Sequence, residues 1–373
     1  MSRALFRRRR TEESGPLRGE PLSLESLEER AKTLAALFTL ARGSRTGGHD
    51  VRVLLQHNIR VLRGAYRALA ADVHRGDVVD PAAEWLLDNF HLVESEAHAV
   101  RHDLPNRYYR KLPKLAAREH SGKARLYAMA LALIRHGDGR LDQERLTRFV
   151  LAYQTVAPLT IGELWAWPSM LKLALLENLR ILADGMMAAR AARRQADGAV
   201  AALESGLAQQ PFPTPLHSAF VAQVRQRMRE YDPRVSSLRL RVEKTLGTAG
   251  TTPEDSVRSE NQREATDQAS TANTITSLRL TSTLDWSHYV ERVSQVDQIL
   301  RRDPAAVYPR MDFQSRDRYR HVVEEIAEPN GEAQVRVALR AVESARAVAE
   351  LKGTRDRAAH VGHHLIGSGR AGL

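Results

Sequence analysis

Apolar side chains recur at steps of three and four residues along most of the chain, and this spacing limits the possible folds. The first such run consists of Leu24, Leu27, Ala31, Leu34 and Phe38. Residues at these steps share one face of a helix, because a helix has 3.6 residues per turn. Ala, Leu, Arg and Glu, all good helix formers, dominate the composition, and Val and Ile rarely occur in alternating runs. We therefore expect an all-α fold, built as an array of helical hairpins in two lobes.

Breaks in this periodicity divide the chain into five predicted segments. Residues 1–21 are basic and contain Gly and Pro, which predicts a disordered arm. Residues 22–246 and 278–352 form the two helical lobes. Residues 247–277, rich in Thr, Ser, Asn, Gln and Glu, are predicted to be a polar connector or an exposed helix without a core of its own. Residues 353–373 form a Gly- and His-rich tail that we expect to be truncated.

The chain of 373 residues carries a formal net charge of +11. A basic protein can bind nucleic acid, an anionic membrane or an acidic partner. Arginine is interleaved with Glu and Asp along most segments, which argues against nucleic acid as a partner. The one clear cluster is Arg7–Arg10, which is either a solvated part of the arm or an anchor to anionic phospholipid head groups.

The sequence lacks the features of several kinds of functional site and of targeting or membrane segments. There is no cysteine, so disulfides, thiolate metal sites and cysteine nucleophiles are absent. No apolar run follows the N-terminal charges, so no secretory signal is predicted. The most apolar segment, residues 158–182, contains Glu163, Lys172 and Glu177 and is predicted to be a buried helix, not a membrane span. Thr160 and Glu163 are expected to start that helix as a capping box.

Metal and cofactor sites are not predicted. The sequence has no dinucleotide, phosphate-loop or nucleophile-elbow motif. His91 and His98 lie seven residues apart with Glu94 between them, a spacing that suits a metal, but hydrogen bonding on a partly buried helix face is the simpler explanation. The tail histidines at 360, 363 and 364 are discounted, because a glycine-rich tail offers no fixed geometry.

No catalytic residue is predicted either. Paired carboxylates carry out glycoside chemistry, but Glu94 and Glu96 point about 160° apart on a helix and cannot act on one bond. Asp312 and Asp317 stand among arginines in the segment DFQSRDRYR, which favours an ion-pair lattice over an acid–base pair.

The segment from Glu84 to Pro113, EWLLDNFHLVESEAHAVRHDLPNRYYRKLP, is the best candidate for a binding site. It combines aromatic rings with carboxylates, an amide, histidines and arginines. Such a mixture can hold a sugar, whose faces are apolar and whose edges are polar, or it can lock one domain against another. The residues expected to line a polar groove are Trp85, Asn89, His91, Glu94, Arg101, Tyr108 and Tyr109. Secondary candidates are Trp165, Trp286, Tyr308, Asp312 and Arg316.

Four segments together resemble one protein family. They are EWLLDNFHLVESEAHAVRHDLPNRYYRKLPKLA, GDGRLDQERLTRFVLAYQTVAPLTIGELWAWPSMLKLALLENLR, STLDWSHYVERVSQVDQILRRDPAAVYPRMDFQSRDRYRHVVEEIA and HVGHHLIGSGR. These motifs are long, and the likeness extends over roughly residues 20–370. They resemble the N-terminal region of cyclic β-1,2-glucan synthases.

The resemblance implies large bacterial inner-membrane enzymes in which a UDP-glucose-dependent glucosyltransferase is followed by a phosphorylase-like domain. Neither catalytic domain lies in this chain, so no active-site residue is transferred and no cofactor is expected. We expect an N-terminal accessory or scaffold module, or a truncated chain, at the cytoplasmic face of the inner membrane. Its expected partners are the two catalytic domains, and β-1,2-glucan is a possible ligand. The alternative is a protein–protein interaction scaffold that makes no contact with carbohydrate.

Overall fold

Helices account for the regular structure of the chain. The computed structural model describes residues 17–41, 51–116, 120–205, 212, 215–230, 236–248 and 250–372. These residues contain no β-strand, only two isolated bridges that pair Leu40 with Leu115 and Lys114 with Ala124. The predicted all-α fold is therefore confirmed.

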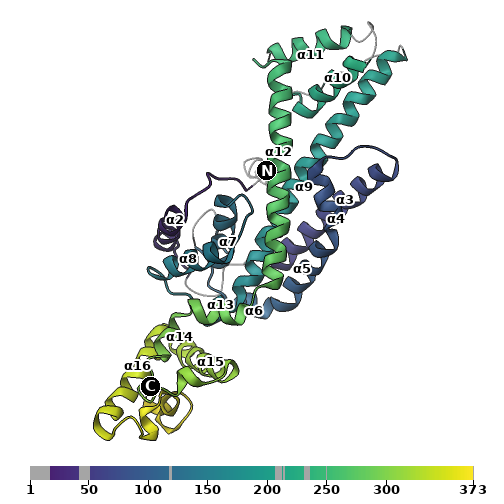
Figure 1. Ribbon diagram of the computed structural model, residues 1–373. Helices are drawn as coiled ribbons and strands as arrows, with labels where there is room; N and C mark the ends of the chain where they lie inside the picture. The colour runs from purple at the N-terminus through teal and green to yellow at the C-terminus, as the bar shows by residue number, and fades with distance from the viewer. Residues whose placement is uncertain are drawn as a thin grey trace, which may run out of the picture.

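The helices carry the labels of Figure 1. The first part of the chain contains α2 (Leu24–Leu37), α3 (Val51–His74), α4 (Pro81–Asp88), α5 (Phe90–Asp103), α6 (Asn106–Lys111), α7 (Arg125–His136), α8 (Gln143–Gln154) and α9 (Ile161–Glu204). The second part contains α10 (Ser218–Glu230), α11 (Ser236–Thr248), α12 (Pro253–Thr283), α13 (Trp286–Val293), α14 (Gln295–Leu300), α15 (Phe313–Asn330), α16 (Gln334–Lys352) and α17 (Val361–Leu365). The short 3-10 helices are η2 (Tyr308–Arg310), η3 (Arg357–Ala359) and η4 (Ser368–Gly372).

Side-chain caps begin several helices. At the start of α2 the Ser23 hydroxyl accepts a hydrogen bond from the Ser26 amide (3.2 Å). At the start of α9 the Thr160 hydroxyl accepts from the Glu163 amide (3.1 Å), and the Glu163 carboxylate accepts from the Thr160 amide (2.9 Å). This is the predicted capping box, and it satisfies two amides that have no partner inside the helix.

Helix α9 is the central element of the molecule. It has 44 residues and is therefore about 66 Å long. In Figure 1, α3 and α4 lie on one side of α9, α2, α7 and α8 lie on the other, and α12 runs alongside it. The largest core forms where these helices meet, around residues such as Leu62, Val93, Leu133, Leu175 and Leu278.

Two smaller cores lie toward the ends of α9. The C-terminal lobe, α14 to α17, packs around Leu300, Val323, Val337 and Val361 and includes Ile161 from the first turn of α9. Figure 1 shows this lobe at the lower end of the molecule. At the upper end, Ala192 and other small residues of α9 pack with α10 and α11 in a third core.

The polar segment predicted at residues 247–277 lies mostly in α12. One face of this helix is buried against α4 and α9, and it buries mainly polar side chains, among them Glu260, Asp267, Ser270 and Thr274. Because these inward-facing residues are polar, the composition did not indicate that one face of the helix is buried. The predicted domain boundaries themselves stay a prediction.

The glycine- and histidine-rich tail is folded, which differs from the expectation of a flexible end. Its residues form η3, α17 and η4 and pack on α16. Val361 and Leu365 enter the core of the C-terminal lobe, so two buried apolar side chains anchor the segment.

Two further predictions concern other parts of the chain. The Arg7–Arg10 cluster, and with it most of the predicted basic arm, lies outside the described residues. In the part of the chain that the structure describes, no helix is both long enough and apolar enough to span a bilayer.

Candidate functional site

The segment from Glu84 to Pro113 forms three short helices, not one continuous groove wall. α4 carries Trp85, α5 carries His91, Glu94 and Arg101, and α6 carries the two tyrosines. Helix α5 has 14 residues, so it separates Trp85 from Tyr108 by about 20 Å along its axis. The seven main candidates therefore divide into separate environments.

The candidates on α5 lie at the surface. His91, Glu94 and Arg101 are exposed, and Glu94 accepts a hydrogen bond from Arg63 of α3 (2.8 Å). Glu96, on the opposite side of the helix, is buried and pairs with Lys172 of α9 (2.7 Å). The two carboxylates thus point apart, as expected from their spacing.

Asn89 joins α4, α5 and α12. Its side-chain amide donates to the Trp85 carbonyl (3.0 Å), and its side-chain oxygen accepts from Arg279 of α12 (2.9 Å). Asn89 is buried, whereas the Trp85 side chain remains 36% exposed. Asn89 is therefore occupied by the fold, and Trp85 is available to a ligand.

The two tyrosines of α6 face the interior. Tyr109 is buried, its hydroxyl accepts from the Ala124 amide (3.3 Å), and the Lys114 ammonium lies 3.2 Å from its ring centroid. Burial lowers the pKa of Lys114 to about 8. The Tyr108 hydroxyl donates to the carbonyl of Gly162, in the first turn of α9. Burial, followed by the charges of Glu324 and Glu163, raises the pKa of Tyr108 far above its usual value.

Tyr108 belongs to the interlobe junction, where α6 and the start of α9 meet α15 and α16. There Lys111 pairs with Glu328 (3.0 Å), and the Ile161 amide donates to the Gln334 side chain (2.8 Å).

The candidate Trp165 lies in the same place. Its ring packs edge-on against Phe313 of α15, with 6.1 Å between the centroids, and it touches both the main core and the core of the C-terminal lobe. Trp165 thus joins the two lobes, whereas the hydrogen bond of Tyr108 joins α6 to α9 within the main lobe.

The C-terminal lobe contains a network of ion pairs, of which Asp297 and Arg320 are buried and the other members half-buried. Its centre is Arg320, which has no exposed surface and donates to Asp297 (2.8 Å), Glu291 (3.1 Å) and Asp317 (3.0 Å). Arg316 adds two hydrogen bonds to Glu291 (2.8 and 2.9 Å). We call Glu291, Asp297, Arg316, Asp317 and Arg320 the buried charge cluster.

The electrostatics of this cluster are those of a closed ion-pair lattice. Burial alone would raise the pKa of Glu291, but hydrogen bonds from Arg316 and Arg320 outweigh it and hold the pKa below its usual value. The candidate Tyr308 is fully buried and donates to Asp297 (2.8 Å). Burial first, and then Asp297, raises its pKa far above normal. The Glu291 carboxyl and the Tyr308 hydroxyl are therefore each held in one protonation state near neutral pH.

The candidate Asp312 stands apart from this lattice. It is exposed and caps α15 by accepting from the amide and the hydroxyl of Ser315 (2.9 Å each). Trp286 likewise serves the fold, since its indole N–H donates to the Thr281 carbonyl (2.9 Å) at the turn from α12 to α13. Both residues stabilise helix ends.

Asp303, Tyr319 and His360 form a second buried polar arrangement, which the sequence did not indicate. One Asp303 oxygen contacts His360 Nδ1 (2.8 Å), and His360 Nε2 contacts the Tyr319 hydroxyl (3.1 Å). Asp303 also accepts from the amides of Tyr308 (3.1 Å) and Val361 (3.0 Å). These contacts tie the tail to α15 and to the loop that precedes it.

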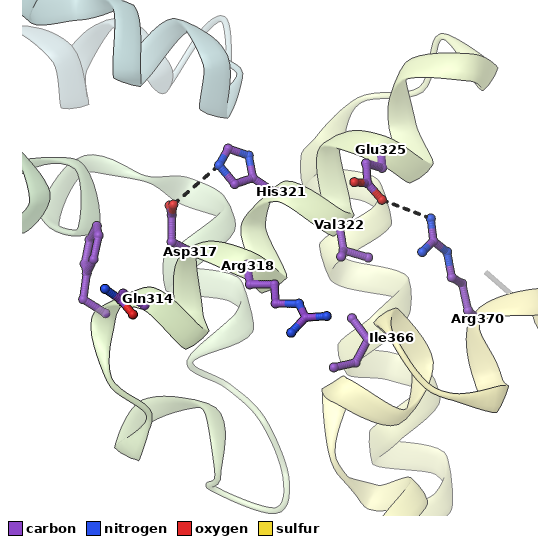
Figure 2. A pocket seen from close by; sticks show the side chains of 9 residues that line it. Gln314, Asp317, Arg318, His321, Val322, Glu325, Ile366 and Arg370 are labelled. Carbon is purple, nitrogen blue, oxygen red and sulfur yellow. Dashed lines mark hydrogen bonds and ion pairs between the residues drawn. The ribbon is translucent and has the colours of Figure 1, made fainter.

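The C-terminal lobe also carries a surface pocket of about 500 Å³. Figure 2 shows its lining, in which Arg318 points toward Ile366, His321 pairs with Asp317, and Glu325 pairs with Arg370. A second pocket of about 620 Å³ lies between α2 and the end of α7. None of the twelve predicted site residues lines either pocket. Within the described residues no group of three His, Asp or Glu side chains is placed to hold a metal ion.

Comparison with known proteins relates these features to a family. No family model matches the chain. One curated relative, the cyclic beta-(1,2)-glucan synthase NdvB of Rhizobium meliloti (strain 1021), is 34% identical over 337 residues, which cover 87% of this chain. The resemblance to cyclic β-1,2-glucan synthases is confirmed. The chain spans only 12% of the length of that synthase.

The segments that carry the resemblance to the synthases also supply the residues that sequence reasoning missed. Glu291, Asp297 and Asp303 lie in the run STLDWSHYVERVSQVDQILRRDP, and His360 begins HVGHHLIGSGR. Gly362 of the second run lies so close to the Tyr319 hydroxyl and to His360 that an added Cβ would stand 2.6 Å from His360 Nε2. In the sequence, the glycine between His360 and His363 was the one signal that the tail packs closely, because glycine is small enough for a close approach.

Proposed function

We propose that this chain is a helical accessory or scaffold module in cyclic β-1,2-glucan synthesis, without a catalytic centre of its own. The observation that carries the proposal is the similarity to a synthase over 87% of this chain and only 12% of the synthase. Most of the length of the synthase therefore lies outside the region to which this chain is similar. Its proposed partners are the glucosyltransferase and phosphorylase-like domains that the resemblance implies, at the cytoplasmic face of the inner membrane.

The electrostatics of the interior support a role without catalysis. A general acid or base works best with a pKa near the operating pH. Tyr308, which is buried, and Tyr108, which is half-buried, have raised pKa values. The pKa values of the Asp303 carboxyl, which is buried, and of the Glu291 carboxyl, which is half-buried, are lowered. Each of these groups is held in one protonation state by its neighbours, as expected of structural pairs.

The direct test uses the purified 373-residue chain with radiolabelled UDP-glucose. We expect no label in polysaccharide from the chain alone. Incorporation above the level of a heat-denatured sample would overturn the proposal.

A glucan-binding role and a pure scaffold role make different use of the predicted residues. Tyr108, Trp165, Tyr308 and Arg316 are engaged inside the fold, which supports a scaffold. Trp85, His91, Glu94 and Arg101 remain accessible, so these four are the residues through which we propose glucan contact.

Isothermal titration with linear β-1,2-glucan separates the two roles. Glucan contact predicts heat that is lost in a Trp85→Ala, His91→Ala variant. The variant His288→Ala, Leu351→Ala changes two exposed residues elsewhere and should bind as the original chain does. Absence of heat at millimolar glucan would leave the scaffold role.

A further inference from the structure

Helix α3 carries its arginines along one side. Arg52, Arg60, Arg63 and Arg67 are all exposed, and at 100° per residue they fall within an arc of about 80°. The only carboxylate of the helix, Asp72, is buried and bound by Arg190 and Arg194 of α9. The exposed side of α3 is therefore basic with no acidic residue of its own.

Helix α5 lies antiparallel beside α3 and extends this basic surface. The register follows from two contacts, the Arg63–Glu94 pair (2.8 Å) and the stacked rings of Tyr66 and Phe90, whose centroids lie 4.3 Å apart. The exposed residues of α5 next to Glu94 are His91, His98 and Arg101. We call Arg52, Arg60, Arg63, Arg67, His91, Glu94, His98 and Arg101 the α3–α5 face.

Three arginines of this face carry charges that no neighbouring carboxylate compensates. Among the described residues, Arg60, Arg67 and Arg101 form no ion pair. Arginines can also be neutralised within the fold, as Arg193 of α9 is by Asp80 (2.6 Å) and Glu264 (3.2 Å).

We propose that the α3–α5 face docks on an anionic phospholipid bilayer. Its α3 arginines extend over 15 residues of straight helix, or about 22 Å, which suits a plane of phosphates better than a single bound anion. The two described pockets lie elsewhere.

The chemistry of the face distinguishes a bilayer from an acidic protein. Protein interfaces place aromatic and large apolar side chains at their centre. On α3 the exposed large apolar side chains are Val53 and Val73, and both lie outside the arc of the arginines. Electrostatic adsorption to lipid head groups needs no apolar centre, and each arginine near such a surface strengthens partition about fivefold. The face shares His91, Glu94 and Arg101 with the glucan contact proposed above, whereas the α3 arginines belong to bilayer docking alone.

Vesicle sedimentation of the full chain tests the proposal. Vesicles of pure phosphatidylcholine are compared with vesicles in which a third of the lipid is phosphatidylglycerol, at physiological salt. We expect binding only to the second kind. The variant Arg60→Glu, Arg67→Glu, Arg101→Glu should lower the partition coefficient about 100-fold or more, and unchanged circular dichroism would show that it folds.

A matched variant controls for net charge. Arg336→Glu, Arg346→Glu, Arg355→Glu makes the same change in charge at exposed positions of the C-terminal lobe and tail. Because salt screens charges beyond about 8 Å, we expect it to lose no more than about threefold. Equal losses in both variants would overturn the proposal. So would equal binding to both kinds of vesicle, or tighter binding to polyglutamate than to the anionic vesicles.

Discussion

Arg320 carries the largest single-residue effect that we expect in this protein. Its guanidinium is fully enclosed and shared by three carboxylates, one of which, Asp297, is also fully enclosed. A charge removed from water is tolerated only when its partners remain in place, so losing one member exposes the others to the full cost of desolvation.

Replacing Arg320 with Met should destabilise the protein by about 3–5 kcal/mol, because the buried Asp297 would keep only one of its two arginine partners, Arg301 (2.6 Å). The measurement is urea denaturation at neutral pH. Arg318→Met, two residues away at the surface, should change the stability by less than about 0.5 kcal/mol. Equal effects of the two substitutions would contradict the role assigned to the buried charge cluster.

Asp303 predicts a dependence of stability on pH. Burial alone would raise its pKa, but hydrogen bonds from His360 and from the amides of Tyr308 and Val361 outweigh burial and lower the pKa below 3.8. A carboxyl with a lowered folded-state pKa stabilises the protein above its unfolded-state pKa. That contribution is lost as the pH falls through the folded-state value, so the window lies below about pH 4.

The variant Asp303→Asn should therefore lose more stability relative to the original chain at pH 6 than at pH 3. Thermal unfolding at a series of pH values measures this difference. A constant difference across the series would show that the Asp303 carboxylate makes no charge-dependent contribution.

At the residue scale, local pairs were predictable and distant pairs were not. The run DFQSRDRYR indicated an ion-pair lattice, and Asp317 does pair with Arg320 three residues later. Asp297 lies 23 residues from Arg320, and Asp303 lies 57 residues from His360. Such pairs depend on how the helices cross, which spacing along the chain does not determine. The seven main candidate residues were predicted to form one groove because they are close in sequence. In the structure the length of α5 separates them.

Among the helices, α12 shows how a polar segment can still be a buried element. Its inward face binds the turn between α7 and α8 through hydroxyl groups. Ser277 donates to the Gly139 carbonyl (2.7 Å) and accepts from the Leu141 amide (2.8 Å), and Ser270 donates to Asp138 (2.5 Å). The helix is held by hydrogen bonds to backbone groups that would otherwise be buried without partners.

Ser277→Ala should destabilise the protein by about 1–3 kcal/mol, because it leaves a buried carbonyl and a buried amide unsatisfied. Ser282→Ala on the same helix is the matched control, since Ser282 is exposed and bonds only within its own helix. Denaturant unfolding compares them. A cost for Ser277→Ala no larger than that of the control would contradict this account of α12.

Most helices could be read from the spacing of apolar residues, and α12 marks the limit of that method. Leu24, Leu27, Ala31 and Leu34 share one face of α2 as predicted, and three of these four are buried. The inner face of α12 consists of Ser, Thr and acidic residues, so periodicity had no apolar stripe to detect. Asn273 of this helix donates to the Asp138 carbonyl (3.2 Å), in a turn 135 residues earlier in the chain.

At the scale of the whole molecule, the interlobe junction couples the folding of the main lobe to that of the C-terminal lobe. The hydrogen bonds of Tyr108 to Gly162 and of Ile161 to Gln334 join the start of α9 to α6 and α16. The Lys111–Glu328 pair (3.0 Å) and the hydrogen bond from Gln295 of α14 to the Gln154 carbonyl (2.9 Å) also join the lobes. The contacts that cross between the lobes should favour unfolding of both lobes in one transition.

The double variant Gln295→Ala, Gln334→Ala removes two hydrogen bonds between the lobes and should turn a single calorimetric transition into two, with a loss of about 2 kcal/mol in the coupling of the lobes. The matched variant Gln56→Ala, Gln143→Ala changes two exposed glutamines of the main lobe and should keep one transition. Two transitions in the original chain would mean that the lobes are already independent.

The helix shared by the three cores has a mechanical consequence. α9 contributes Ile161 to one core, Leu175 to the next and Ala192 to the third, over about 66 Å. A rod of this length works as a lever: tilting one end by about 5° displaces the other by about 6 Å. Any force applied to the tip formed by α10 and α11 would be felt at the opposite end of the protein, amplified by geometry alone.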